Sequence, residues 1–291
     1  MKTRMAIFAV LLGLPGGRLA AQNRGTISGF LKDVTGAVVP NANVTVTHEG
    51  TRAVRTASSD ASGFYQVLGL VSGAYTIEAE VAGFKRYRNT GVVLRVDENV
   101  RADITLEIGQ VTESIDVTAQ AVLVDTRSSQ NTAVIDDRRI VDLPLRNRNV
   151  FALAATLAGV LNVRAPDNSD LTDTRAGPTM NVNGGRANMN YNRFNGTYFN
   201  NPSRNTGLNV PPPDAVQEFK IQTSNFAADS GRNPGANVTI VSKSGSNQFH
   251  GALWEFLRND NLNARNFFQA QKPQLIQNQY GAAAGGPIRR D

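Results

Sequence analysis

The side chains that most often do catalytic or metal chemistry are scarce in this chain. It has no cysteine and only two histidines, His48 and His250, which lie far apart in the sequence. Zinc and iron–sulfur sites need thiolates or closely spaced histidines, so we expect no such metal centre. Asp167, Asp170 and Asp173 recur at every third position, but the glycine and distal glutamate of a calcium loop are missing. We therefore interpret that segment as a solvated loop.

The sequence motifs of common enzyme classes are also absent. There is no Gly-x-Ser-x-Gly elbow, no phosphate-binding loop with its lysine and no Gly-x-Gly-x-x-Gly. We expect neither catalysis nor a bound cofactor. The net charge is +6, but Lys2, Arg4 and Arg18 account for half of it, and the other basic residues are scattered. Nucleic-acid binding requires a concentrated basic patch, so we expect no nucleic-acid partner.

The amino terminus has the composition of a secretory signal peptide. Lys2 and Arg4 precede an apolar run over residues 5–14, and Ala20 and Ala21 provide a small-residue end. The run is too short for a membrane-spanning helix, which takes roughly 20 apolar residues. We predict that residues 1–21 are a signal peptide. Export without any cysteine indicates a bacterial envelope.

Residues 22–108 have the pattern of a β-sandwich. Residues 44–47, 75–81 and 104–108 alternate apolar side chains with Thr or Glu, which is typical of strands with one buried face. Turn-forming sequences, such as residues 33–36 and 60–63, separate these runs at short intervals. Short strands with this spacing predict two packed antiparallel sheets.

The same segment resembles a carboxypeptidase regulatory-like domain. The motifs that carry the resemblance are Gly25-Thr26-Ile27-Ser28-Gly29, Val39-Pro40-Asn41-Ala42, Asp60-x-x-Gly63-x-Tyr65, Gly69-Leu70-x-x-Gly73-x-Tyr75 and Gly83-Phe84. The resemblance implies a prealbumin-like sandwich, a fold class grouped with carbohydrate-binding modules, and it implies no peptidase activity. Five aromatic residues are candidates for a sugar-stacking platform, but we expect them to fill the core and edges of the sandwich: Phe64, Tyr65, Tyr75, Phe84 and Tyr87.

Residues 109–125 form a linker that contains a short alternating segment. An extended segment of this kind can add to the sheet edge of another protein through main-chain hydrogen bonds. It resembles a TonB box, by which outer-membrane receptors contact the energy-transducing protein TonB, although the last strand of the sandwich would have the same pattern. The candidate TonB-contact residues are Glu113, Ser114, Ile115, Asp116, Val117, Thr118 and Ala119.

Residues 126–245 have mixed character. Residues 136–143 predict a short helix that Pro144 ends, and residues 151–158 are good helix formers followed by Gly159. Residues 181–209 are rich in Asn and Gly and predict loops. Residues 237–242 predict a strand. The order of elements indicates an α+β domain.

These pieces resemble the plug of TonB-dependent receptors of the Oar-like subgroup. The motifs are Leu143-Pro144-Leu145 with Arg148-Asn149, Asn181-Val182-Asn183-Gly184-Gly185-Arg186, Pro213-Asp214-Ala215-Val216-Gln217-Glu218-Phe219-Lys220, Ser230-Gly231-Arg232 and Lys243-Ser244-Gly245. Phe194-Asn195-Gly196 stands where the family usually has Leu-Asp-Gly, so Asn195 removes a charge from a local turn. The resemblance implies ligand recognition by plug loops, for which the candidates are Arg186, Asn188, Asn190, Tyr191, Arg193, Asn195, Tyr198 and Asn200.

Residues 246–291 resemble the beginning of a membrane β-barrel. Residues 249–258 form a candidate membrane strand, with Trp254 and Phe256 on one face as interfacial aromatics. At roughly 9–11 residues a strand, the segment holds about four strands, too few to close a barrel. We expect a mainly β protein that consists of a prealbumin-like sandwich, an α+β plug and the first strands of an incomplete transmembrane barrel. The chain would then be the amino-terminal part of a longer receptor.

Two functions remain open at this point. The first is energy-coupled uptake of a small molecule or an oligosaccharide by an outer-membrane transporter, with the amino-terminal domain in the periplasm and TonB as partner. The second is a free periplasmic or cell-surface module that uses the sandwich to hold carbohydrate or protein. The sequence identifies no particular substrate.

Overall fold

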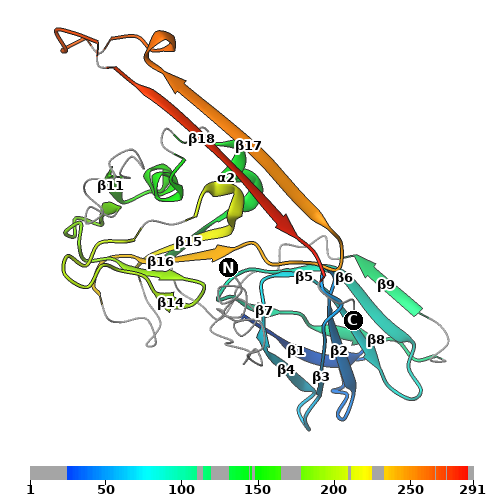
Figure 1. Ribbon diagram of the computed structural model, residues 1–291. Helices are drawn as coiled ribbons and strands as arrows, with labels where there is room; N and C mark the ends of the chain where they lie inside the picture. Colours follow the sequence, from blue (N-terminus) through cyan, green and yellow to red (C-terminus); the bar gives the residue numbers. More distant parts are fainter. Residues whose placement is uncertain are drawn as a thin grey trace, which may run out of the picture.

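The computed structural model describes residues 25–109, 114–118, 131–143, 145, 148–164, 178–208, 211–224, 233–265, 267–272 and 274–287. The predicted signal peptide, Glu113, Ala119, the segment that holds Asp167, Asp170 and Asp173, and the Ser230-Gly231-Arg232 motif lie outside these residues. A sandwich, a second domain and a long hairpin follow one another along the chain (Figure 1).

The sandwich consists of two sheets. One has the order β4-β1-β7 with β8 also paired to β1, and the other has the order β3-β2-β5-β6-β9. The strands are β1 (Gly25–Asp33), β2 (Asn43–His48), β3 (Val54–Ser58), β4 (Phe64–Leu70), β5 (Gly73–Glu80), β6 (Arg86–Leu94), β7 (Asn99–Arg101), β8 (Ile104–Leu106) and β9 (Ser114–Thr118). The predicted alternation is confirmed: in β2, Val44 and Val46 are buried between partly exposed threonines.

Two turns of the sandwich use the same local chemistry. The carboxylate of Asp33 accepts hydrogen bonds from the Thr35 hydroxyl and from the backbone N–H groups of Thr35 and Ala37. The carboxylate of Asp60 does the same for the Ser62 hydroxyl and the backbone of Ser62 and Phe64. These hydrogen bonds lower the pKa of both aspartates, the threonine or serine hydroxyl contributing most. Each Asp-x-Thr/Ser-Gly sequence is therefore a self-contained turn.

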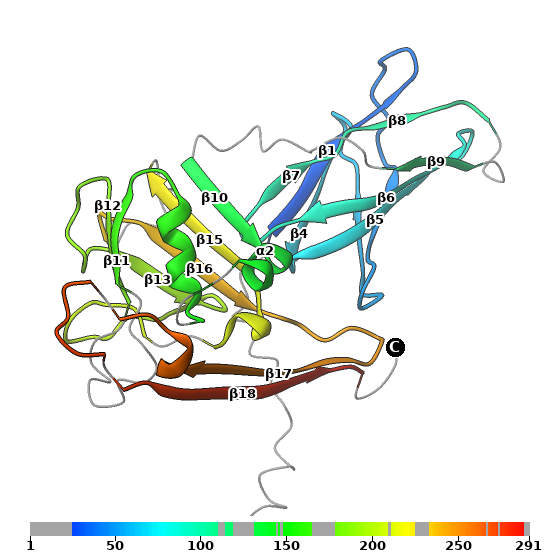
Figure 2. The same ribbon diagram turned by 90° about the horizontal axis from the view of Figure 1, so that it is seen from above.

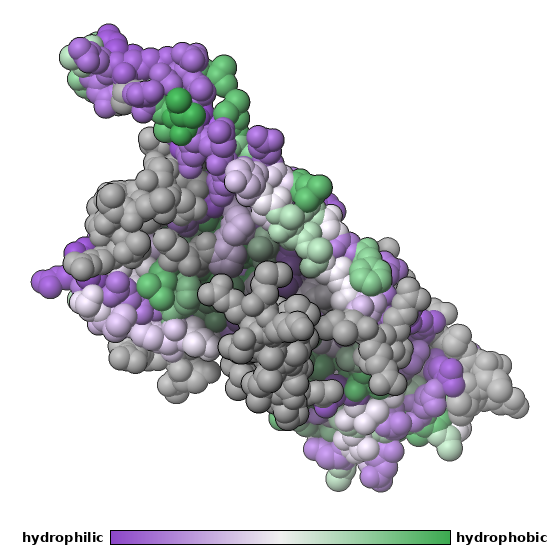
Figure 3. All heavy atoms as spheres, in the orientation of Figure 1, coloured by the Kyte–Doolittle hydropathy of each residue, from purple (hydrophilic) through white to green (hydrophobic). Residues whose placement is uncertain are grey.

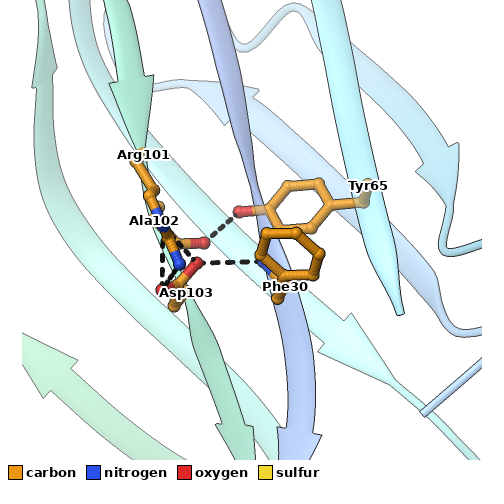
Figure 4. A network of polar contacts seen from close by, with 5 residues as sticks. All are labelled: Phe30, Tyr65, Arg101, Ala102 and Asp103. Atoms are coloured by element: carbon orange, nitrogen blue, oxygen red, sulfur yellow. Dashed lines mark hydrogen bonds and ion pairs between the residues drawn. The ribbon is translucent and has the colours of Figure 1, made fainter. Parts of the chain in front are cut away.

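Aromatic and aliphatic side chains fill the space between the two sheets. Tyr65, Tyr75 and Tyr87 are buried, and Phe64 and Phe84 are half-buried, so the expectation of a core role holds for the tyrosines. The Tyr65 hydroxyl donates to the Ala102 carbonyl at 2.6 Å. Beside it, Asp103 accepts from the Phe30 backbone and from the Arg101 guanidinium (Figure 4). This network joins β4, β1 and the end of β7.

His48, the last residue of β2, is buried instead of facing solvent. Its side chain is 7% exposed and lies edge-to-face on the Tyr75 ring, with ring centroids 4.9 Å apart. Its Nδ1 accepts from the backbone N–H groups of Gly50 and Thr51. The pattern of β2 alone could not show that the following turn folds back over this ring. His250 is exposed at the start of β17.

The second domain is built on a mixed five-stranded sheet with the order β10-β15-β16-β13-β14. Its strands are β10 (Asn131–Asp136), β15 (Val216–Ser224), β16 (Asn237–Ser242), β13 (Tyr191–Phe194) and β14 (Thr197–Tyr198). A separate pair consists of β11 (Val160–Arg164) and β12 (Thr179–Val182). The core includes Phe151, Phe219, Val238 and Ile240. We call this unit the plug; the exact boundaries of the domains stay a prediction.

The helices of the plug are shorter than the sequence suggested. The predicted helix at residues 136–143 is α2 (Asp137–Asp142), and Asp136 caps it by accepting from the Arg139 backbone. The segment 151–158 is not an α-helix: it forms the 3-10 helix η1 (Val150–Thr156), because the side chains of Val150, Phe151, Leu153 and Ala154 are all drawn into the core. Another 3-10 turn, η2 (Pro213–Ala215), precedes β15. No helix of the described residues is long and apolar enough to cross a membrane.

The last element is a hairpin of two ten-residue strands, β17 (His250–Asn259) and β18 (Ile276–Gly285), with the 3-10 turn η3 (Asp260–Leu262) in between. It runs along the plug in both ribbon views (Figures 1 and 2). Leu253 is 87% exposed and lies opposite Ala282, and the next pair on the same face is Glu255 opposite Tyr280. Apolar and polar side chains both appear along its visible side in Figure 3.

The two faces of the hairpin differ from the sequence expectation. Phe256 lies under the plug side chain Arg148, and Trp254 covers Gly281, where an added Cβ would lie 2.5 Å from the indole. Trp254 and Phe256 therefore share the face that is turned toward the plug. The opposite face carries Leu253, Glu255, Leu257 and Tyr280 and is turned away from the plug. The alternation predicted a strand correctly, but only the plug shows which face is inward.

Candidate functional site

The candidate TonB-contact segment is the edge strand of the sandwich. Residues 114–118 form β9, which pairs in parallel with β6, Ser114 opposite Arg86 and Thr118 opposite Thr90. This is the position of a last sandwich strand, the alternative that the sequence left open. Within the described residues only one side of β9 is paired, so its other main-chain edge is available to a further strand.

The candidate ligand-facing residues do not form one surface. Arg186 and Asn188 are exposed in the turn after β12. Tyr191 and Tyr198 lie at the paired strands β13 and β14 and stack on each other, with ring centroids 5.2 Å apart. Of the predicted ligand-facing residues, only these four have a polar or aromatic group at or near the surface and lie away from the contact with the sandwich.

Asn190 and Asn200 are buried, which corrects their assignment to a ligand-facing loop. Asn190 is 3% and Asn200 is 5% exposed. The Asn200 amide donates to the Asn190 carbonyl and accepts from both nitrogens of Asn192, and the Asn190 amide donates to the Met180 carbonyl. The asparagine-rich sequence was interpreted as loop, yet these side chains replace strand pairing inside the plug. They hold irregular backbone together rather than offering groups to a ligand.

Asn195 forms a turn that suits it well. It has φ +48° and Gly196 has φ +83°, as in the two-residue Asn-Gly turn that joins twisted strands. Its side-chain oxygen accepts from the Ser242 backbone N–H at 2.9 Å, and its amide donates to the Ser242 hydroxyl. The departure from the family's Asp thus keeps both the turn and a polar contact to β16. Asn195 also borders a cavity of about 60 Å³ that Val71 and Ser72 of the sandwich complete, so it does not face a ligand from outside.

Arg193 also points toward the sandwich. Its guanidinium forms an ion pair with Asp97 at 2.9 Å, in a position where both side chains are mostly covered. Two neighbouring plug residues, Glu218 and Lys220 on β15, contact the same turn of the sandwich. Burial raises the pKa of Glu218, although the Val96 N–H opposes this; burial lowers the pKa of Lys220, although Asp97 and Glu98 oppose that.

A second group that sequence reasoning missed joins the plug to the hairpin. Arg148, with φ +50°, forms an ion pair with Asp214, and both side chains are largely covered. The guanidinium carbon lies 3.6 Å from the centroid of the Phe256 ring. Phe256 is 40% exposed, so the attraction between this cation and the aromatic face is roughly 1 kcal/mol. Arg148 and Asp214 stand in two separate motifs of the plug, and their distance along the sequence does not indicate that they form an ion pair.

No cluster of three or more His, Asp or Glu side chains within the described ranges could hold a metal ion. The arrangement consists instead of an edge strand on the sandwich, a plug sheet that the sandwich contacts, and a hairpin that the plug contacts through Arg148.

Two family models match parts of the chain. Residues 26–107 match the carboxypeptidase regulatory-like domain, and residues 241–291 match an outer membrane beta barrel domain. The fold and these matches define an outer-membrane β protein whose amino-terminal sandwich lies in the periplasm.

The chain is also similar to the TonB-dependent transporter Oar of Myxococcus xanthus. The two are 26% identical over 302 residues, which is 97% of this chain and 27% of the relative. The chain thus spans about a quarter of the length of the curated relative it matches. The resemblance to Oar-like TonB-dependent receptors predicted from the sequence is confirmed.

Among solved structures, the siderophore receptor PirA of Acinetobacter baumannii is 20% identical, with a TM-score of 0.42 over 55% of this chain and 22% of that chain. The ferric enterobactin receptor PfeA of Pseudomonas aeruginosa is 16% identical, with a TM-score of 0.41 over 57% and 24%. These relatives are named as transporters or receptors, not enzymes.

Proposed function

We propose that this chain is the periplasmic head and plug of a TonB-dependent outer-membrane transporter. The plug would close the barrel lumen and rearrange when TonB pulls on it, so that a small molecule or an oligosaccharide passes inward. The observation that carries this proposal is the packing of the plug on β17 through Arg148, Asp214 and Phe256, in a chain similar to Oar over almost its full length. On this proposal the chain itself carries out no catalysis.

We propose that residues 113–119 are the TonB contact. The support is the position of β9 at a sheet edge, where main-chain N–H and C=O groups can pair with a strand of the partner. A strand of TonB could pair with the free edge of β9 or take the place of β6 beside it. In either case the main-chain hydrogen bonds would let TonB exert a pulling force on the segment.

The alternative of a free binding module is not favoured by any observation. A free module would expose three large side chains on one face of the hairpin to water beside Glu255, with Leu253 87%, Leu257 58% and Tyr280 80% exposed. The same face is accounted for if it meets lipid.

The TonB contact is tested by capture of the chain on the immobilised periplasmic domain of TonB. Deletion of residues 110–122 and Val117→Pro should both abolish capture, since proline removes a main-chain donor from the strand. The matched control is Thr56→Pro in β3, the opposite edge strand of the same sheet, which should leave capture intact. Undiminished capture of the deletion variant would refute the assignment.

A further inference from the structure

Lys220 is buried on the side of its sheet where solvent is expected. In β15, Phe219 points into the plug core, so Glu218 and Lys220 on either side of it point the other way. A lysine in that position normally extends its ammonium into water. Here Lys220 is 6% exposed. Something outside the plug must therefore cover it.

The covering element is the turn of residues 95–98 in the sandwich, which we call the latch turn. The Val96 N–H donates to Glu218 Oε2 at 2.8 Å. Lys220 Nζ donates to the carbonyl oxygens of Val96 at 2.8 Å and Asp97 at 2.9 Å. One carboxylate and one ammonium thus hold the N–H and C=O of the same residue. The Arg193–Asp97 ion pair adds a charged contact to this clamp.

The latch turn is firmly part of the sandwich. The Arg95 N–H donates to Glu98 Oε2, and the Glu98 carbonyl accepts from the Thr26 N–H in β1. Val96 is 1% exposed. The clamp therefore grips a turn that is already fixed, not a loose loop.

A second contact lies at another turn of the sandwich. The Asn247 backbone N–H donates to the Gly50 carbonyl at 3.0 Å, and the Asn247 side-chain amide donates to the Thr51 carbonyl at 3.0 Å. The same two parts of the chain also line the cavity of about 60 Å³, with Val71 and Ser72 on one side and Asn195 and Ser242 on the other. Asn247 lies in the connection between β16 and β17, so the sandwich is held both at the plug sheet and at the segment that leads from the plug to the hairpin.

We propose that this surface fastens the sandwich to the plug, so that the two move as one body until the clamp of Glu218 and Lys220 on Val96 opens. The partner of the latch turn is this chain's own β15. The latch turn follows directly on β6, and β6 also carries β9. A pulling force on β9 would therefore be transmitted through β6 to the latch turn and to its contacts with Glu218 and Lys220. That mechanical role rests on the proposed TonB contact, whereas the fastening itself does not.

The fastening is tested by the distance between spin labels in the two domains of the whole chain in detergent. Because the chain has no cysteine, Val34→Cys in the sandwich and Arg204→Cys in the plug, both exposed, give two unique labelling sites. The labels should give one narrow distance distribution. Lys220→Met and Glu218→Ala should each broaden it, and Glu218→Gln should retain it because the amide oxygen still accepts from Val96. Lys85→Met, a lysine of the sandwich away from the clamp, is the control that should leave it narrow.

Amide hydrogen exchange gives a second readout in the same molecules. Exchange of the Val96 amide should accelerate at least about tenfold in Glu218→Ala. The neighbouring Arg95 amide, bonded within the sandwich to Glu98, should be unchanged.

A broad distance distribution in the doubly labelled chain that carries no substitution at Glu218 or Lys220 would by itself overturn the proposal, whatever the variants do. A narrow distribution that survives both Lys220→Met and Glu218→Ala would also overturn it. If TonB capture does not depend on residues 110–122 but the distances respond as expected, then the proposed TonB contact fails and the fastening stands.

Discussion

The sandwich and the plug are both β-sheet domains, yet their interiors are made differently. Among the described residues, the sandwich buries five polar side chains, Ser28, His48, Ser59, Ser72 and Asn89, within a larger apolar cluster. The plug buries nine with a smaller apolar cluster, although Lys220 is covered by the sandwich and not by the plug itself: Asn149, Asn190, Asn192, Asn200, Thr206, Lys220, Gln222, Asn237 and Thr239.

The difference indicates how each domain is stabilised. Apolar burial is non-directional and contributes roughly 25 cal/mol per Å², whereas a buried amide contributes little net free energy and is costly when its partner is lost. The plug is therefore tied by specific hydrogen bonds that break one set at a time. Such an interior suits the proposed rearrangement of the plug under a pull better than a continuous apolar core would.

The largest effect should come from the plug interior. Asn200→Ala removes an amide that bonds Asn190 and Asn192, leaving several buried groups unpaired, and should lower the free energy of unfolding of the plug by about 2–3 kcal/mol. In the sandwich, Tyr65→Phe removes one hydrogen bond, to Ala102, and should cost about 1 kcal/mol. Urea unfolding of both variants measures the comparison.

The exposed Asn188 provides the control for this pair. Asn188→Ala should change stability by less than about 0.5 kcal/mol, since its side chain is at the surface. If Asn200→Ala and Tyr65→Phe lower the free energy of unfolding equally, then the buried hydrogen bonds of the plug do not contribute more to stability than the one in the sandwich.

The two domains should also respond differently to acid. The Thr35 and Ser62 hydroxyls lower the pKa of Asp33 and Asp60, and for Asp103 burial raises the pKa, but the Arg101 and Phe30 hydrogen bonds outweigh it. A carboxyl whose pKa is lower in the fold stabilises above the unfolded value of about 3.9, and that contribution is lost as the pH falls through the folded pKa. Sandwich stability should therefore fall below about pH 4.

Glu218 at the plug has the opposite sign. Its raised pKa means that the fold disfavours the carboxylate, so its contribution becomes more favourable as the pH falls through the folded pKa toward about 4.3. Urea midpoints recorded between about pH 2 and 7 follow both effects. The double variant Asp33→Asn and Asp60→Asn should flatten the acid limb of the sandwich; an unchanged limb would contradict the role of the two turns.

At the Asn-Gly turn, a conservative change should have a small effect and a non-conservative change a larger one. Asn195→Asp retains an acceptor for the Ser242 N–H and a residue that tolerates positive φ, so the plug should lose less than about 1 kcal/mol. Asn195→Ala loses the acceptor and disfavours the left-handed backbone, and should cost about 2 kcal/mol. Thermal unfolding ranks the two. A larger loss for Asp than for Ala would show that charge, and not turn geometry, decides this position.

The sequence by itself determined the elements that depend on local patterns. Period-two alternation in residues 44–47, a strand at residues 237–242, the turns at residues 33–36 and 60–63 and a short helix at residues 136–143 were all predicted, because side-chain periodicity and turn chemistry need only near neighbours. The family resemblance added the order of the sandwich, the plug and the first membrane strands.

Only the tertiary structure determined which residues are buried and which distant residues come into contact. The burial of His48, Asn190 and Asn200, the choice of the Trp254 and Phe256 face as inward, and the clamp of Glu218 and Lys220 on Val96 all join residues distant in sequence. Polar residues look alike in a sequence whether they face water or another domain. Their environment is set by which surfaces come together, because burial and pairing are properties of the assembled chain and not of its local pattern.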